Sequence, residues 1–282
     1  MDVGKKTAFY YHADASVLGG TLTQPVSRVL AADGSVSLAQ AGGFNSLTLE
    51  AFRLDSLVAF NTANVTVSGT EQKEQGGWRT ITSATVEQLN VLNVVTADRI
   101  VAQVSVMHYF DENRPTQITF NGTQFVNLRV NGEPVELTMD RRVYGAATFD
   151  GQDSDSGGRA PTKRPCFNDL IQVAEAQYRE TAQVRKILVE RFGQRFAWRD
   201  PQVDLEKKGN ALCTLVREVK AGAPAQGYAH VLHVPDFGNI FLGEVMVGRF
   251  SAQLTMLRLE MGCMADGTLS VLSTFSNGST MP

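Results

Sequence analysis

Short β-type segments separated by turn residues fill the first half of this chain, and they constrain the fold more than any other feature. The segments are rich in Val, Ile, Leu, Thr and Phe, and Gly, Asn, Asp or Pro clusters separate them; they cover residues 47–49, 65–67, 86–92, 100–106 and 125–130. β-Branched and aromatic residues favour strands, and the intervening residue types favour turns. The pattern predicts a mainly β protein. Such chains are more often scaffolds or binding surfaces than catalysts.

Composition narrows the class of protein further. At 282 residues, the chain can bury a substantial core without disulfides or a metal ion. A formal net charge of −3 gives no general attraction to nucleic acid, so we expect no nucleic-acid partner. No run approaches the roughly 18–20 apolar residues of a membrane span. Residues 7–11 are too short and too polar for a signal-peptide core.

Two β architectures fit the strand pattern. A Thr-Ala phrase followed by Asn or Asp begins at Thr62 and again at Thr96, which is 34 residues later (96 − 62). Similar phrases at a constant period are typical of a β-solenoid, in which each coil stacks on the one before it. We therefore predict a wound, solenoid-like β body. The alternative is a β-sandwich with a helical insertion.

The hydrophobic period changes in the second half of the chain. Residues 150–165 are rich in Gly, Ser, Asp and Pro, and this composition predicts an exposed loop. In residues 168–192 the apolar positions step by about 3.6, which predicts one long amphipathic helix packed on the β body. Asn168 is the expected N-cap, and Gly193 follows the expected C-terminus.

Strand patterns return after this helix. We expect strands at residues 228–234, 240–247, 253–261 and 269–275, which either form a meander or close the first β body. The chain then has a β-rich N-terminal part, a loop-and-helix insertion and C-terminal strands that complete the same body, with bounds at residues 1–149, 150–227 and 228–282.

The loop carries a candidate calcium site. Asp153, Asp155 and Gly157 have the spacing that opens a calcium loop, and Asp150 is a further oxygen donor. An EF-hand loop has Gly sixth and Glu twelfth, whereas here Gly157 is fifth and Arg164 is twelfth. The main interpretation is an exposed linker without a cofactor, and calcium is the alternative.

Glu244 stands inside the apolar run 240–247, and Arg258 lies on the next expected strand. A buried carboxylate requires a partner, so we predict a structural pair of these two side chains. His230 and His233 add zinc-ligand types near Glu244, but positions i and i+3 of a strand point to opposite faces. We therefore expect an ordinary strand here.

Three cysteines, Cys166, Cys213 and Cys263, lie far apart in the sequence and form no C-x-x-C motif. They allow at most one disulfide, and buried free thiols are the main interpretation.

Several phrases carry a family resemblance. They are residues 83–98, residues 120–135 (FNGTQFVNLRVNGEPV), residues 238–244, residues 254–259 and a closing Asn277-Gly278. Together they resemble the bacterial "choice-of-anchor P" family of exported proteins, many of which end in an anchoring tail. The resemblance implies an exported bacterial β protein at the cell surface or outside the cell. It transfers no site residues. A cytoplasmic location is the alternative, since no signal peptide is present.

These observations lead to three functional hypotheses. The first is a non-enzymatic extracellular or cell-surface structural protein that self-assembles through β edges into a homo-oligomer or polymer. The second is a glycan or small-ligand binding module whose aromatic side chains form a stacking platform, with Trp78, Tyr109, Phe196 and Trp198 as candidates. The third is a hydrolase that uses Glu244 with Asp236 or a histidine.

Overall fold

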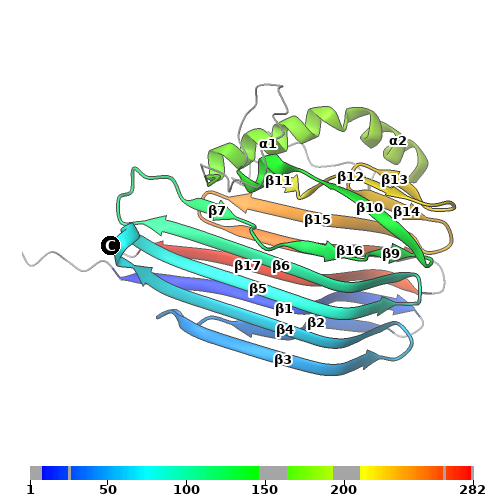
Figure 1. Ribbon diagram of the computed structural model, residues 1–282, viewed down its shortest axis with the longest axis horizontal. Helices are drawn as coiled ribbons and strands as arrows, with labels where there is room; N and C mark the ends of the chain where they lie inside the picture. Colours follow the sequence, from blue (N-terminus) through cyan, green and yellow to red (C-terminus); the bar gives the residue numbers. More distant parts are fainter. Residues whose placement is uncertain (1–7, 25–26, 146–163, 193–209, 263–264, 281–282) are drawn as a thin grey trace, which may run out of the picture.

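The computed structural model describes residues 8–24, 27–145, 164–192, 210–262 and 265–280. In these residues the chain forms two antiparallel β-sheets that pack face to face, with helices along one side (Figure 1). The predicted mainly β class with a helical part is confirmed.

The first sheet, sheet I, joins the two ends of the described chain. Its strands are β1 (Phe9–Gln24), β2 (Arg28–Ser37), β11 (Asn210–Thr214), β13 (Gln226–Tyr228), β14 (Val231–Val234), β15 (Gly238–Gly248), β16 (Ala252–Gly262) and β17 (Asp266–Thr280). Their order is β13-β14-β15-β16-β17-β1-β2, and β11 also pairs with β15. The C-terminal strands β14 to β17 form a meander, and β17 then pairs along the whole of β1.

The second sheet, sheet II, is built mainly from long consecutive hairpins. Its strands are β3 (Gly43–Leu54), β4 (Val58–Gln72), β5 (Gly77–Val91), β6 (Val95–Tyr109), β7 (Gln117–Thr119), β8 (Gln124–Val126), β9 (Arg129–Val130), β10 (Glu133–Met139) and β12 (Val216–Ala221). The order is β12-β10-β9-β6-β5-β4-β3, and β7 and β8 also pair with β6. The turn expected at Asn131-Gly132 is confirmed: φ is 52° and 81°, so both residues are left-handed, as in a type I′ turn.

Of the two architectures left open by the sequence, the strand pairing corresponds to a two-sheet sandwich with a helical segment. A wound stack would place successive coils in parallel, whereas the ladders of both sheets are antiparallel. Thr62 lies on β4 and Thr96 on β6, two strands further along the sheet. The 34-residue spacing between the two Thr-Ala phrases is therefore the length of one hairpin, and the solenoid interpretation of this spacing is wrong.

The segment expected to be an insertion also contributes to both sheets. β11 pairs with β15 in sheet I, and β12 pairs with β10 in sheet II. Residues 210–221 are thus part of the sandwich itself.

The helix predicted for residues 168–192 is divided in two. Helix α1 (Phe167–Glu180) ends at Thr181, and α2 (Ala182–Phe192) follows. The Thr181 hydroxyl donates a hydrogen bond to the carbonyl of Gln177 at 2.6 Å, a local bond that bends or interrupts helices. The N-cap is Cys166 and not Asn168, because the Cys166 N–H donates to the Asp169 carboxylate at 2.9 Å.

The two helices pack on different parts of the sandwich. Helix α1 contacts β11 and β15 and buries Leu170 and Val173 in the main core. Helix α2 packs on the outer face of sheet I, where Leu188 contacts Val231 and Phe241 in a separate small apolar cluster. None of the described helices is long and apolar enough to cross a membrane.

Two of the cysteines lie in the packed interior. Cys166 and Cys213 are buried free thiols, and burial raises the pKa of Cys213 to about 12. Cys263 lies outside the described residues.

Candidate functional site

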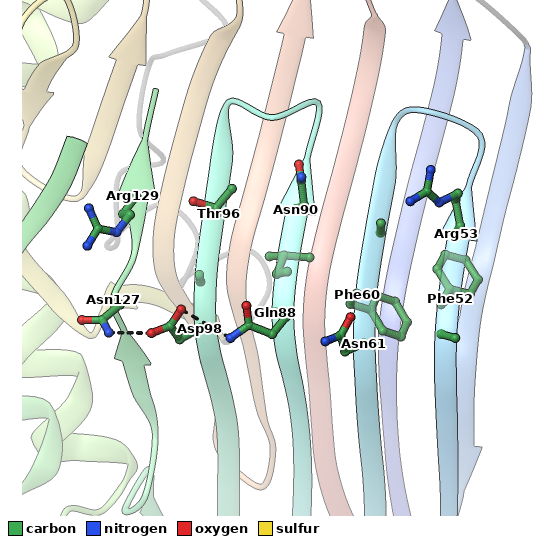
Figure 2. Close-up of a pocket in the computed structure, with 14 residues that line it drawn as sticks. Phe52, Arg53, Phe60, Asn61, Gln88, Asn90, Thr96, Asp98, Asn127 and Arg129 are labelled. Carbon is green, nitrogen blue, oxygen red and sulfur yellow. Dashed lines mark hydrogen bonds between the residues drawn. The ribbon is translucent and has the colours of Figure 1, made fainter. Parts of the chain in front are cut away.

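A shallow groove of about 560 Å³ lies on the outer face of sheet II. It crosses β3, β4, β5 and β6 and reaches the connection between β8 and β9. Figure 2 shows polar side chains from these strands standing in rows over the sheet. The volume is in the range of ligand sites in proteins, which is about 300–1,000 Å³.

The groove follows a line at which the alternation of inward and outward side chains slips by one residue. In a regular strand every second residue is buried. On β5, however, the next buried residue after Val86 is Leu89, three positions later, and on β6 the next buried residue after Ala97 is Ile100. Two consecutive residues therefore point outward on each strand. The outward pairs across the sheet are Glu50 and Ala51, Asn61 and Thr62, Glu87 and Gln88, Asp98 and Arg99, and Val126 and Asn127.

Alternate strands accommodate this slip with a left-handed residue. φ is 51° at Ala51, 54° at Gln88 and 51° at Asn127. None of the three is glycine, and the left-handed conformation costs an L-residue roughly 1–2 kcal/mol. The groove that forms along this line on the outer face of sheet II makes it a candidate functional site.

The strand register places the residues along one side of the groove in a row that crosses the sheet. Five residues lie directly opposite one another on adjacent strands: Arg53, Ala59, Asn90, Thr96 and Arg129. The small side chains of Ala51 and Ala59 leave the hollow, whereas the arginines stand at its two ends. Under the β3–β4 end, the rings of Phe52 and Phe60 are stacked with centroids 4.8 Å apart.

Amide side chains hold the only carboxylate among the groove-lining residues. Asn127 Nδ2 donates to Asp98 Oδ2 at 2.5 Å, and Gln88 Nε2 donates to Asp98 Oδ1 at 3.4 Å (Figure 2). The two amides still offer their carbonyl oxygens to a ligand, and each side-chain amide has both donor and acceptor capacity. The arrangement can therefore bind groups that donate and accept hydrogen bonds, such as sugar hydroxyls.

Trp78 and Tyr109, two of the aromatic side chains that the sequence singled out, do not line this groove. Trp78 lies ten residues along β5 from Gln88 (88 − 78), roughly 33 Å at the rise of a strand. Its ring stacks on Phe9 with centroids 4.6 Å apart. Tyr109 is at the same end, beneath the Arg114 guanidinium. Phe196 and Trp198 lie outside the described residues.

The candidate calcium ligands Asp150, Asp153 and Asp155 also lie outside the described residues. Within the part of the chain that the structure describes, no group of three or more His, Cys, Asp or Glu side chains is placed to hold a metal ion.

The structure brings Glu244 and Arg258 together on the outer face of sheet I. Arg258 donates through Nε to Glu244 Oε2 at 2.6 Å and through Nη2 to Glu244 Oε1 at 2.8 Å. It also binds Glu260, and its guanidinium packs over the ring of Phe241. Glu244 thus makes the bidentate pair that gives Arg–carboxylate contacts their strength and geometry.

These contacts determine the charge of Glu244. Burial by itself raises the pKa of Glu244, but the hydrogen bonds from Arg258, together with the electrostatic interaction with nearby His230, outweigh this effect and hold the pKa at about 2. The carboxylate is therefore ionised at neutral pH and both of its oxygens are engaged, which favours a structural pair over a general acid or base. His230 Nε2 lies 3.7 Å from Glu244 Oε1, whereas His233 contacts Asn239.

Residues 9–248 match a family described as a domain of unknown function, DUF8256. Comparison with curated proteins and with solved structures returns no match. The resemblance to choice-of-anchor P proteins, and the exported location that it implies, stay predictions.

The sequence alone does not predict the groove residues. It carries one signal: the polar pairs Glu87-Gln88 and Asp98-Arg99 interrupt otherwise alternating strands. Each pair alone is compatible with an ordinary surface or a turn. Only the register shows that such pairs are aligned across the sheet.

We expect Ala51→Gly to stabilise the protein by about 0.5–1 kcal/mol. Glycine removes the left-handed strain of roughly 1–2 kcal/mol, and this gain exceeds its entropic cost of about 0.5–1 kcal/mol. Urea unfolding measures the change. The control is Ala102→Gly at a fully buried position of β6 outside the left-handed set, which should destabilise by about 1 kcal/mol. Equal losses at both positions would contradict the strain argument.

We expect Glu244→Gln to destabilise the fold by about 3 kcal/mol at pH 7, because the pKa of Glu244 is lowered from 4.5 to about 2 in the folded state. A depressed carboxyl pKa contributes its full stability above the unfolded value. The difference between wild type and variant should therefore shrink as pH falls from about 4.5 to about 2.

Denaturant unfolding over this pH range measures the effect. Glu218→Gln is the matched control, since Glu218 pairs with Lys220 at the surface and should change stability by less than about 1 kcal/mol. A Glu244→Gln cost that does not vary with pH would rule out the ion pair as its origin.

Proposed function

Since this chain belongs to the DUF8256 family, whose function is unknown, we propose from its geometry that the protein is a non-enzymatic module that binds an extended glycan in the groove of sheet II. The observation that carries this proposal is the line of aligned left-handed residues, which turns an ordinary sheet face into a hollow lined by amides. Exported placement agrees with such a role and rests on the family resemblance of the sequence.

The chemistry of the lining suits hydroxyl-rich ligands. Asn61, Gln88 and Asn127 carry amides and Thr96 carries a hydroxyl, so the groove offers both donors and acceptors. The amide of Asn90 already bonds Asn93 through both its nitrogen and its oxygen. The hollow runs across five strands, which corresponds to about four interstrand spacings or roughly 19 Å. This length suits an oligomer that lies across the strands better than a single sugar.

The same lining supports binding over hydrolysis. Glycosidases of the common type use two carboxyl groups that flank the scissile bond. Among the residues that line the groove, Asp98 alone carries a carboxylate, and Asn127 and Gln88 already bind its two oxygens.

The test removes one amide without disturbing the backbone. Gln88→Gly suits the left-handed conformation at this position, so the fold should be kept while the side chain is lost. On a glycan array followed by calorimetry, we expect the glycan that wild type binds to lose about five- to tenfold in affinity, which corresponds to one or two hydrogen bonds.

Gln253→Ala is the matched control, because Gln253 is an exposed glutamine on β16 of sheet I. It should leave affinity unchanged. Ala51→Gly is a second control, which places glycine at another left-handed position of the groove without removing a polar group. Wild-type protein that binds no glycan, or a Gln88→Gly variant with full affinity, would refute the proposal. Quenching of Trp78 fluorescence is not expected, since Trp78 is far from the groove.

A structural role through β edges is the second candidate, and the exposure of two edge strands favours it. β2 and β3 are the terminal strands of the two sheets, and they carry Val29 and Phe44, whose exposed fractions are 70% and 69%. The left-handed Ala51 and the charges of Glu50 and Arg53 interrupt the flat edge of β3, so the N-terminal part of this strand is the better pairing segment.

If this second candidate holds, wild-type protein should form dimers or polymers whose fraction rises with concentration. Phe44→Lys should reduce that fraction at least fivefold, because a charge on an edge strand opposes pairing. Light scattering across concentration measures it, with Gln253→Lys at an exposed position of the interior strand β16 as the control. A monomer at all concentrations removes this candidate and leaves glycan binding untouched.

A further inference from the structure

We propose that the ligand of the groove is an acidic linear glycan that lies across the strands, with its acidic groups bound by Arg53 and Arg129. This inference rests on the proposed glycan-binding function and specifies the class of glycan. It starts from the two ends of the groove, which carry the same cationic group although they come from strands that are distant in the sheet.

The register places the two arginines on one line. Arg53 lies opposite Ala59, and Thr96 lies opposite Arg129, with Asn90 between these pairs. The backbones of the outer two strands are about four interstrand spacings apart, or roughly 19 Å. A ligand that reaches both guanidinium groups must therefore be an oligomer that crosses the strands.

Both guanidinium groups are available for a ligand. Arg53 and Arg129 are exposed, and neither makes an ion pair in the described part of the chain. Arg129 uses Nη1 to donate to the carbonyl of Gly132 at 3.1 Å, a contact with the turn between β9 and β10 that leaves its other N–H groups for a ligand. A planar guanidinium binds a carboxylate or a sulfate ester through two parallel hydrogen bonds.

The remaining charges orient the ligand. The next row, beyond the groove, carries Glu50 on β3, Glu87 on β5 and Arg99 on β6. Glu50 and Glu87 would repel an acidic group near the β3–β5 part of that row, and Arg99 lies directly opposite Glu87. Asp98, in the middle of the groove, is already bound by two amides. Acidic groups are therefore directed toward the Arg53–Arg129 row, while hydroxyl groups face the amides.

The experiment uses the full chain and matched pairs of probes. Calorimetry compares hexamers of galacturonate, of a glucuronate-containing glycan and of a sulfated galactan with the same hexamers after carboxyl reduction or desulfation. We expect at least one acidic hexamer to bind about tenfold or more tightly than its neutral form, with an advantage that falls as salt rises.

Variants test the two ends separately. Arg53→Gln and Arg129→Gln should each weaken binding of the acidic hexamer by about tenfold, whereas the neutral form should be affected little. For the corresponding acidic disaccharide, which cannot span both ends, at most one of the two variants should matter. Arg28→Gln on β2 of sheet I is the matched control and should change nothing.

The outcomes separate this inference from the function on which it rests. If neutral hexamers bind as tightly as acidic ones and Gln88→Gly weakens both, glycan binding stands and the acidic specificity is overturned. If acidic hexamers bind but neither arginine variant changes the affinity, the placement of the acidic groups is overturned. If no acidic or neutral hexamer binds, both proposals fall.

Discussion

Burial of two apolar sheet faces against each other is the constraint on which the rest of this structure depends. In a strand, a shift of one residue sends every later side chain to the other face. If one strand of a sheet slips, its neighbours must slip at the same level or lose their buried residues. The outward pairs of sheet II are therefore aligned from β3 to the end of β8.

Sheet I contains a slip of the opposite sense in several strands. Consecutive residues are both buried on β1 (Val17 and Leu18), β16 (Met256 and Leu257) and β17 (Val271 and Leu272). The slip positions of the two sheets come together at the edge of the sandwich. There, a side chain at Gly34 of β2 would collide with Val17 of β1 and with Leu49 of β3. The doubled inward residues of one sheet thus accompany the doubled outward residues of the other, and the interior stays packed.

The outer faces of the two sheets differ in what covers them. On sheet I, α2 packs over Val231 and Phe241, and Arg258 ties Glu244 and Glu260 together beside them. On sheet II, the rows around Gln88 and Asp98 are open and form the groove (Figure 2). Left-handed residues accompany the slip in both sheets, at Ala51, Gln88 and Asn127 in sheet II and at Ala32, Gly243 and Leu272 in sheet I. In sheet II the doubled residues point outward, and there the slip shapes the open surface of the groove.

Local patterns in the sequence determined the mainly β class, the hairpin turn at Asn131-Gly132 and the helical segment near residue 170, because each depends on neighbouring residues alone. The Glu244–Arg258 pair was also foreseeable, since a carboxylate in an apolar strand needs a cation on the next one. The break at Thr181, the two-sheet architecture and the groove were decided by tertiary structure. Val86 and Leu89 show the physical reason: three residues apart, both are buried, and only the register with β4 and β6 reveals that the neighbouring strands slip at the same level.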